Sequence, residues 1–292
     1  MTEGTTLSQL KELLRLHRMR ATKRLGQHFL IDSDVLKDIA AAADLGEEDT
    51  VVEVGAGTGL LTAILAAQVA EVIAVEIDPR MVELLQETLR SARNVTVVQS
   101  DILQVTPEQL LAGRSRRSDR QGYKVVANLP YYITSPVLRH FISAGLKPDL
   151  MVVMVQEEVG RAITAQPGDM SLLSVSVQLF AQPSKVRRVP ASCFYPPPKV
   201  DSLVVRLDTF NCPLVEPGKA GEFLHFVAAG FRSPRKQLRN SFCHGLGATR
   251  QYVDDLLSQV RIDGTRRPET LMVEEWVRLW EANRGMMELG AC

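Results

Sequence analysis

Glycine and carboxylate residues follow the first three apolar runs of the chain in an arrangement that suits a nucleoside-containing ligand. The segment Glu53-Val-Gly-Ala-Gly-Thr-Gly59 has glycines, Gly55 among them, where a backbone must approach a ligand closely. Glu76 ends the next run and can accept hydrogen bonds from both hydroxyls of a ribose. Asp101 follows the third run and can accept a hydrogen bond from an adenine amino group. Because parallel strands end at one edge of a sheet, we expect these groups to share one binding site.

The spacing of the glycines narrows the choice of ligand. Gly59 comes one residue earlier than the third glycine of the GxGxxG pattern of dinucleotide sites, where this chain has Leu60. The spacing therefore favours an adenosine ligand without a pyrophosphate, and together with the two carboxylates it predicts S-adenosylmethionine as the cofactor. An NAD-type site is the alternative.

The segment Asn128-Leu-Pro-Tyr131 follows the fourth apolar run and suits methyl transfer to the exocyclic amine of a base. Such a nitrogen is a weak nucleophile because its lone pair is delocalised into the ring. The side-chain carbonyl of Asn128 and a backbone carbonyl of Leu129-Pro130 can each accept one of its N–H groups. Tyr131 can stack on the base. A plain turn built from Asn and Pro is the alternative.

Short β-branched runs alternate with longer stretches of helical spacing, which predicts βαβ units and a mainly parallel sheet. The predicted core strands are 50–54, 72–76, 95–99, 124–127 and 150–155, and the predicted helices between them are 60–70 and 79–92. Two later runs, 185–189 and 200–207, predict a terminal hairpin on the sheet. The fold class is therefore α/β, a Rossmann-like methyltransferase sheet followed by a smaller all-helical domain.

A segment with two prolines, 211–218, marks the predicted domain boundary. We expect a basic arm over 1–24, the Rossmann-like domain over 25–210 and a helical RNA-binding domain over 211–292. Lys+Arg and Asp+Glu are equal in number, 34 each, so any preference for a polyanion must come from local patches. The predicted patch lies along a helix over 231–242 and consists of Arg232, Arg235, Lys236 and Arg239, which would contact phosphates. Solvated surface charge is the alternative.

Composition excludes several classes of protein. Hydrophobic residues make up 45% of the chain and charged residues 23%, which is typical of a globular protein. No apolar stretch approaches the ~20 residues that cross a bilayer, and the basic N-terminus has no apolar segment typical of a signal peptide. The 4 cysteines are far apart and show no metal-ligand spacing. We expect a cytoplasmic protein with free thiols, no bound metal and no membrane contact, and we expect a monomer.

Several motifs, taken in order, resemble those of a known family. They are Gly26-Gln-His-Phe-Leu30, the glycine motif, Asn128 to Tyr131, Gln156-Glu-Glu-Val-Gly-Arg161, Leu173-Ser-Val175 and Phe194-Tyr-Pro-Pro-Pro-Lys-Val-Asp-Ser202. Together they resemble the KsgA (RsmA) small-subunit rRNA adenine dimethyltransferases, over about residues 20 to 280. The erythromycin-resistance methyltransferases share the glycine and Asn-x-Pro-Tyr motifs, but the Gln156–Arg161 segment is closer to KsgA.

The resemblance implies a function and a set of site residues. The function is dimethylation of N6 of two adjacent adenosines in the 3′-terminal hairpin of 16S rRNA, during small-subunit biogenesis. The implied cofactor contacts are His28, Leu30, Gly55, Glu76, Asp101 and Asn128. The implied base contacts are Asn128, Tyr131 and Phe194, with the two aromatic rings on either face of a flipped-out adenine. A core role for Phe194 is the alternative.

The chain departs from the family pattern in three places. His28 stands where the family usually has Asn, which makes this position titratable. Met170-Ser171-Leu172 replaces the usual Tyr-Gly before Leu-Ser-Val, and an apparent insertion at 113–122 is rich in arginine. Two other functions stay open at this point. One is a methyltransferase for protein glutamine or DNA adenine, and the other is an assembly or transcription factor on the same fold.

Overall fold

The computed structural model describes residues 7–17, 27–113 and 122–290. Most of the expected basic arm and the arginine-rich loop at 114–121 lie outside the described residues. The chain forms two compact units, one made of 1–160 and 182–209 and the other of 161–181 and 210–292. The expected boundary after residue 210 is next to the third and last crossing between the units, at 209/210. The structure also assigns 161–181 to the helical unit, because helix α8 (Leu172–Gln178) packs against α9 (Ala220–Gly230).

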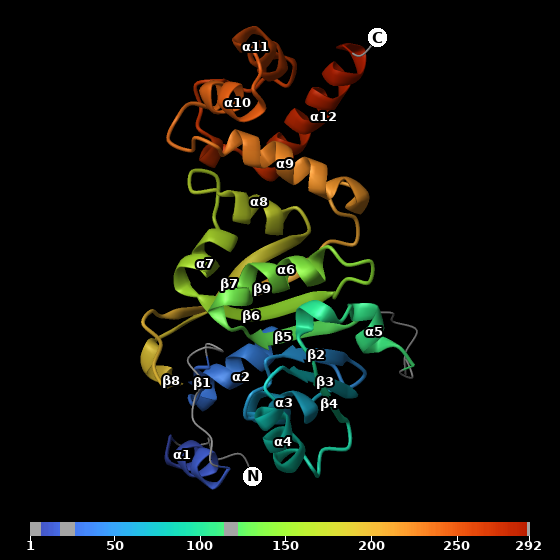
Figure 1. Ribbon diagram of the computed structural model, residues 1–292, viewed down its shortest axis with the longest axis vertical. Helices are drawn as coiled ribbons and strands as arrows, with labels where there is room; N and C mark the ends of the chain where they lie inside the picture. Colours follow the sequence, from blue (N-terminus) through green and yellow to red (C-terminus); the bar gives the residue numbers. More distant parts are fainter. Residues whose placement is uncertain (1–6, 18–26, 114–121, 291–292) are drawn as a thin grey trace. The chain divides into compact units, whose positions relative to one another are not determined.

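The first unit is built on a 7-stranded sheet with the order β4-β3-β2-β5-β6-β9-β7 (Figure 1). Its strands are β2 (Thr50–Val54), β3 (Glu71–Glu76), β4 (Val95–Gln99), β5 (Lys124–Asn128), β6 (Leu150–Gln156), β7 (Ala181–Val189) and β9 (Ser202–Thr209). The pairs from β4 to β6 are parallel, and β9 is antiparallel to β6. The chain runs outward from β2 to β4 and then returns to β5. The carboxyl ends of β2 and β5 are therefore a topological switch point, where open α/β sheets bind ligands.

A second, 2-stranded sheet pairs β1 (Phe29–Leu30) with β8 (Phe194–Tyr195) in antiparallel register. The helices of the first unit are α1 (Leu7–Leu16), α2 (Ser33–Ala42), α3 (Leu60–Ala66), α4 (Pro79–Thr88), α5 (Pro107–Leu111), α6 (Thr134–Ile142) and α7 (Glu157–Ile163), which crosses into the second unit. Short 3-10 turns η2 (Ile102–Gln104), η3 (Tyr131–Ile133) and η4 (Ala191–Cys193) follow strand ends or connect them.

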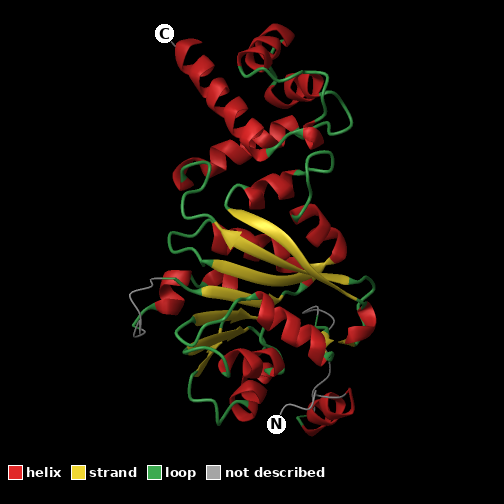
Figure 2. Ribbon diagram, turned by 180° about the vertical axis from the view of Figure 1, so that it is seen from behind, coloured by secondary structure: helices red, strands yellow, loops and turns green. Residues whose placement is uncertain are grey.

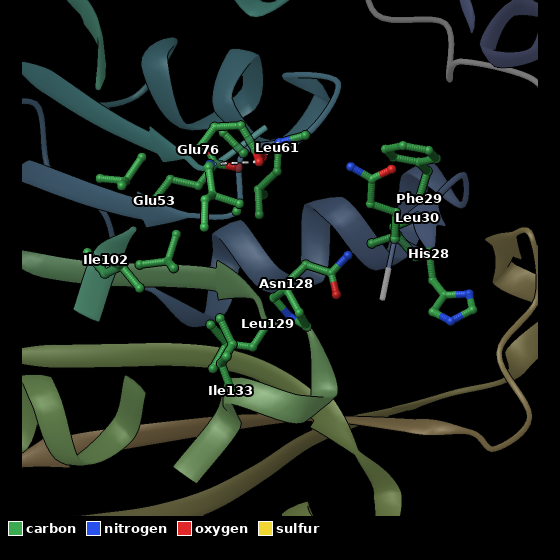
Figure 3. A pocket seen from close by; sticks show the side chains of 18 of the residues that line it. His28, Phe29, Leu30, Glu53, Leu61, Glu76, Ile102, Asn128, Leu129 and Ile133 are labelled. Atoms are coloured by element: carbon green, nitrogen blue, oxygen red, sulfur yellow. Dashed lines mark hydrogen bonds between the residues drawn. The ribbon is translucent and has the colours of Figure 1, made fainter. Parts of the chain in front are cut away.

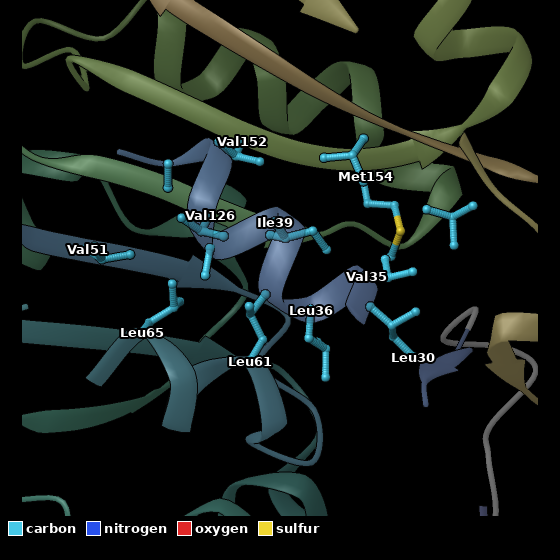
Figure 4. Close-up of a cluster of buried hydrophobic side chains, with 14 of the residues drawn as sticks. Leu30, Val35, Leu36, Ile39, Val51, Leu61, Leu65, Val126, Val152 and Met154 are labelled. Atoms are coloured by element: carbon cyan, nitrogen blue, oxygen red, sulfur yellow. The ribbon is translucent and has the colours of Figure 1, made fainter. Parts of the chain in front are cut away.

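Helices α2 and α3 cover one face of the sheet and form the main core of this unit (Figure 4). Val35 and Ile39 of α2 and Leu65 of α3 pack against Val126 and Val152, and all five are fully buried. Helix α6 lies on the opposite face, as the views in Figures 1 and 2 show from the two sides. Because both faces are covered, the strands are continuous apolar runs and not alternating ones.

The second unit is all helical over its described residues. It contains α8, α9, α10 (Leu238–Leu246), α11 (Arg250–Gln259) and α12 (Val273–Gly290), with 3-10 turns η5 (Pro217–Lys219) and η6 (Pro268–Thr270). Trp276 is its largest buried side chain, and its ring lies 5.2 Å from that of Phe231 and 5.9 Å from that of Phe242. Gly245 allows α10 to cross α9 closely, because a Cβ there would lie 2.0 Å from the carbonyl oxygen of Ala229.

The five predicted core strands are confirmed, with ends that differ by one residue at most. The predicted helices at 60–70 and 79–92 are shorter, ending at Ala66 and Thr88. The predicted hairpin strands are neighbours at the edge of the sheet, as β9 and β7. Within the described residues, no helix combines the length and the apolar character needed to cross a membrane.

Candidate active site

A cavity opens at the carboxyl ends of β2, β3, β4 and β5 (Figure 3). Its lining comes from residues 27–30 around β1, the turn at 53–61, the strand ends at 75–77 and 100–102, and the segment 128–133. The expected site residues among them are His28, Leu30, Gly55, Glu76, Asp101, Asn128 and Tyr131. Segments up to a hundred residues apart in sequence meet here because the strands are parallel and end at the same edge.

The turn after β2 has backbone conformations that favour glycine. Gly55 has φ +74° and Gly57 has φ +54°, and both values lie in the left-handed region. The N–H of Gly57 donates to Oε2 of Glu76 at 3.0 Å, which ties the turn to the end of β3. A side chain at Gly55 would contact the backbone oxygen of Asn128, 3.6 Å from an added Cβ. Because the glycines have no side chains, a ligand can lie close to the backbone at this wall of the cavity.

Glu76 is a buried carboxylate held by three backbone donors. Its Oε1 accepts from the N–H groups of Ile77 and Asp78 at 2.9 and 3.0 Å, in addition to the bond from Gly57 to Oε2. Burial raises the pKa of Glu76, and the three donors oppose this shift. The carboxylate is thus fixed in orientation, with lone pairs left for hydroxyl donors of a ligand.

Asp101 serves first as a helix cap. Its Oδ1 accepts from the N–H of Leu103 at 3.0 Å and caps η2. The side chain also lines the cavity, beside Ser100 and Ile102. One carboxylate oxygen therefore holds the strand end in place, and the other is placed to accept from a ligand.

Glu53 is a site residue to which sequence analysis gave no role of its own. Glu53 lines the cavity, but its side chain is only 2% exposed and its Oε2 is buried. Burial raises the pKa of Glu53 to about 8, and the nearby Thr62 hydroxyl opposes this shift. Its place at the head of the glycine motif was the signal for it.

The charges of the lining suit a cationic adenosine ligand. Glu76 and Asp101 contribute carboxyl groups, Glu53 adds one whose pKa of about 8 favours the protonated form at neutral pH, and the described lining contains no Lys or Arg. S-adenosylmethionine carries a sulfonium and an ammonium group, which such a site would stabilise, whereas a pyrophosphate would meet carboxylates without a compensating cation. The residues present therefore fit S-adenosylmethionine.

Asn128 and Tyr131 stand at the end of β5, which pairs with β2, so Asn128 lies beside the turn that follows β2. Figure 3 shows the amide of Asn128 directed into the open space of the cavity. The hydroxyls of Tyr131 and Ser202 share a hydrogen bond of 2.8 Å, and burial raises the pKa of Tyr131. The His28 ring lies 6.0 Å from that of Tyr131 at an angle of 22°, and its Nδ1–H donates to the carbonyl of Pro196 at 2.7 Å. The histidine thus orders the Tyr131 side of the cavity.

Phe194 lies in the hydrophobic core and not in the lining of the cavity. It is 3% exposed and belongs to the same cluster as Leu30, its partner in the β1–β8 pair. This position matches the alternative of a core residue, because β8 turns the ring inward. Stacking of Phe194 on a base would require the ring to leave the core.

The basic cluster differs from its expected form. The predicted helix over 231–242 is wrong, because α9 ends at Gly230 and α10 begins at Leu238. Arg232, Arg235 and Lys236 are exposed in the connection between these helices, and the structure gives them no ion pair with described residues. Arg239 lies in α10 and forms an ion pair with Asp254, which neutralises part of its charge. The free basic surface of the cluster is therefore the loop at 232–236.

Comparisons with known proteins agree with this geometry. The family model described as "Ribosomal RNA adenine dimethylase" matches residues 18–281. The chain belongs to this family. A relative from Dehalococcoides mccartyi, named "Ribosomal RNA small subunit methyltransferase A", is 45% identical over 94% of this chain and 92% of the relative.

Two solved structures of transferases share the fold. A dimethyladenosine transferase from Plasmodium falciparum has a TM-score of 0.71 at 26% identity and covers 88% of this chain and 98% of its own. The 23S rRNA methyltransferase ErmE has a TM-score of 0.69 at 28% identity, covering 87% and 98% respectively. The Rossmann-like methyltransferase fold predicted for this family member is therefore confirmed.

Two substitutions separate the core role of Phe194 from a stacking role. Phe194→Ala should lower the free energy of unfolding by about 3–5 kcal/mol, because it empties a buried ring position, whereas Phe194→Leu should cost less than about 1.5 kcal/mol. Urea unfolding measures both. Turnover of the folded Phe194→Leu protein then tests whether the Phe194 ring stacks on the target base. Full activity would show that base binding does not need this ring.

Glu53 should make stability depend on pH in a defined direction. Its pKa is about 8 in the folded protein and near 4.5 in the unfolded chain, so the native state binds the extra proton. The stability it contributes is complete below pH 4.5 and is lost as pH rises through about 8. Thermal unfolding should show wild type losing stability relative to Glu53→Gln from pH 5 to pH 9. Exposed Glu48→Gln is the control, and the same trend in that variant would contradict the assignment.

Proposed function

We propose that this protein dimethylates N6 of two adjacent adenosines in the 3′-terminal hairpin of 16S rRNA, with S-adenosylmethionine as methyl donor, in small-subunit biogenesis. The observation that carries the proposal is the position of Asn128 at the switch point, beside a cavity that is rich in carboxyl groups and lacks cations. Membership of the rRNA adenine dimethylase family and the names of the relatives support an rRNA substrate. The small-subunit relative is 45% identical and the 23S enzyme 28%, which favours 16S rRNA.

In this proposal the cofactor lies along the turn at 53–61. Glu76 accepts hydrogen bonds from the ribose hydroxyls, and Asp101 accepts one from the adenine amino group. Gly55 lets the cofactor pass close to the backbone, and His28 and Leu30 close the remaining side. When bound, S-adenosylmethionine supplies an electrophilic methyl group on a sulfonium.

The residues at the end of β5 act on the target base. The side-chain oxygen of Asn128 accepts one N6–H and a backbone carbonyl of Leu129-Pro130 accepts the other, which turns the nitrogen lone pair out of the ring plane. Tyr131 stacks on the adenine, and its hydroxyl is held by Ser202. No strong base is needed, because N6 becomes acidic once it carries the methyl group. The same geometry serves the second methyl transfer, with one N6–H left to hold.

Asn128→Ala tests the assignment of the base site. It should reduce turnover by at least 10²-fold and leave the affinity for small subunits nearly intact. The reason is that the lost hydrogen bond matters chiefly in the transition state. Removing one hydrogen-bonding group that stabilises a transition state typically costs about 2.7–4 kcal/mol. The measurement is transfer of tritium from labelled S-adenosylmethionine to small subunits from cells that lack this methyltransferase. An equal loss of rate and of subunit binding would indicate a folding or docking role instead.

The same assay separates the alternative substrates. Parallel reactions contain small subunits, large subunits, release factor and duplex DNA, and mass spectrometry of the product locates the methyl groups. We expect label only in small-subunit rRNA, on two adjacent adenosines. Label in protein or DNA would overturn the proposed function, and binding without any transfer would favour a non-catalytic assembly factor.

The loop at 232–236 should supply RNA affinity but no chemistry. Replacing Arg235 and Lys236 with Gln removes about two phosphate contacts, so the salt slope of binding should fall by roughly 1.4 to 1.8 log units per log unit of salt. Filter binding across a salt series measures the slope. Arg278→Gln, an exposed charge on α12 of the same unit, is the control. An unchanged slope in the double variant would identify the loop as solvated surface.

A further inference from the structure

Tyr132 is an exposed aromatic residue in the lining of the cavity. Its side chain is 59% exposed, and it follows directly after Tyr131 in η3. The two tyrosines differ in their surroundings, because Tyr131 is fixed by Ser202 and His28 whereas the structure gives Tyr132 no ring contact or hydrogen bond among the described residues. Its ring faces are therefore open to a partner at the mouth of the cavity.

A loop at 196–202 is attached at both ends to residues of the same cavity. Pro196 accepts the hydrogen bond from His28, and Ser202 shares a hydrogen bond with Tyr131. Lys199 is at the midpoint, three residues from each attachment, so its Cα lies within about 11 Å of both by chain length alone. The loop therefore borders the Tyr131 side of the cavity.

Lys199 differs from the arginines near it on β7 and β9, which form ion pairs. Arg188 pairs with Glu157 and Asp201, and Arg206 pairs with Asp208. Lys199 is exposed and has no ion pair among the described residues. Its neighbour in sequence, Asp201, is engaged by Arg188 and by the N–H of Ala191 at 2.8 Å, so the lysine charge is not neutralised locally.

We propose that Tyr132 and Lys199 form a contact surface for the nucleotide next to the target adenosine. An open aromatic ring and a free cation beside one cavity are the two elements with which proteins hold single-stranded nucleic acid, by base stacking and by phosphate contact. The Tyr131–Ser202 hydrogen bond joins the two segments that carry them. While one adenosine occupies the cavity, its neighbour lies at the mouth, with its base on Tyr132 and its phosphate at Lys199. This inference rests on the proposed function and adds an RNA contact within the methyltransferase unit itself.

The two contacts predict different responses to salt, which makes them separable. Tyr132→Ala should weaken binding of small subunits by about 5- to 150-fold with no change in salt slope, because stacking releases no counterions. Tyr132→Phe should bind nearly as wild type, since the ring is kept. Lys199→Gln should lower the salt slope by about 0.7 to 0.9, and Lys199→Arg should restore it.

The experiment is filter binding of the full-length protein to unmethylated small subunits across a salt series, with S-adenosylmethionine titrated into the same preparations. Lys185→Gln, an exposed lysine on β7 without a described ion pair, is the matched control and should have the wild-type slope. Wild-type affinity of Tyr132→Ala, or a wild-type slope of Lys199→Gln, would overturn the corresponding contact. An equal fall of the salt slope in Lys185→Gln would indicate that the basic surface as a whole, and not a local contact of Lys199, attracts the RNA. If the variants bind as expected but wild type transfers no methyl group to the subunits, the proposed function fails and the RNA-binding surface stands.

Discussion

The parallel pairing of β2 with β5 is the constraint on which the site depends. Their register places Val54 opposite Ala127, so the glycine turn and Asn128 leave the sheet side by side. A Cβ added at Gly55 would lie 3.6 Å from the backbone oxygen of Asn128, which is van der Waals contact. The glycine turn and the residue proposed to hold the target amine therefore lie next to each other at one edge of the sheet.

The charges of the cavity lining then favour some ligands over others at this edge of the sheet. Burial makes charged carboxyl groups costly, and the structure compensates Glu76 with three backbone donors, whereas burial raises the pKa of Glu53 to about 8 and favours its protonated form. A ligand with donor groups can bind to Glu76 and Asp101, whereas a phosphate-bearing ligand would add negative charge beside them. The carboxyl groups of the lining therefore favour a ligand without phosphate.

In the proposed function, two surfaces with different tasks bind RNA. The loop at 232–236 belongs to the helical unit and would contact phosphates, which would give affinity and orientation without sequence reading. The proposed contacts of Tyr132 and Lys199 are attached to the cavity through Tyr131 and Ser202. The contacts of Tyr132 and Lys199 would position the target nucleotide as well as contribute to binding of the small ribosomal subunit.

The sequence by itself determined where the core strands lie along the chain and predicted which residues meet at their carboxyl ends. Apolar runs and glycine spacing are local signals, and the rule that parallel strands end together converts them into a site that contains Gly55, Glu76, Asp101 and Asn128. Family resemblance added His28 and Leu30, and these too line the cavity. The roles of all these residues stay predictions until variants are measured.

The tertiary structure decided what local pattern does not encode. Phe194 carries a stacking type of side chain, but its pairing with Leu30 in the β1–β8 sheet turns it into the core. Glu53 looked like part of a turn motif, and only the tertiary structure revealed that its carboxyl group is buried and that its pKa is raised. The basic cluster was predicted to lie on one helix, but α9 ends before it and Arg239 forms an ion pair with Asp254. Burial, pairing and charge neutralisation depend on residues distant in sequence, and for that reason the sequence could not supply them.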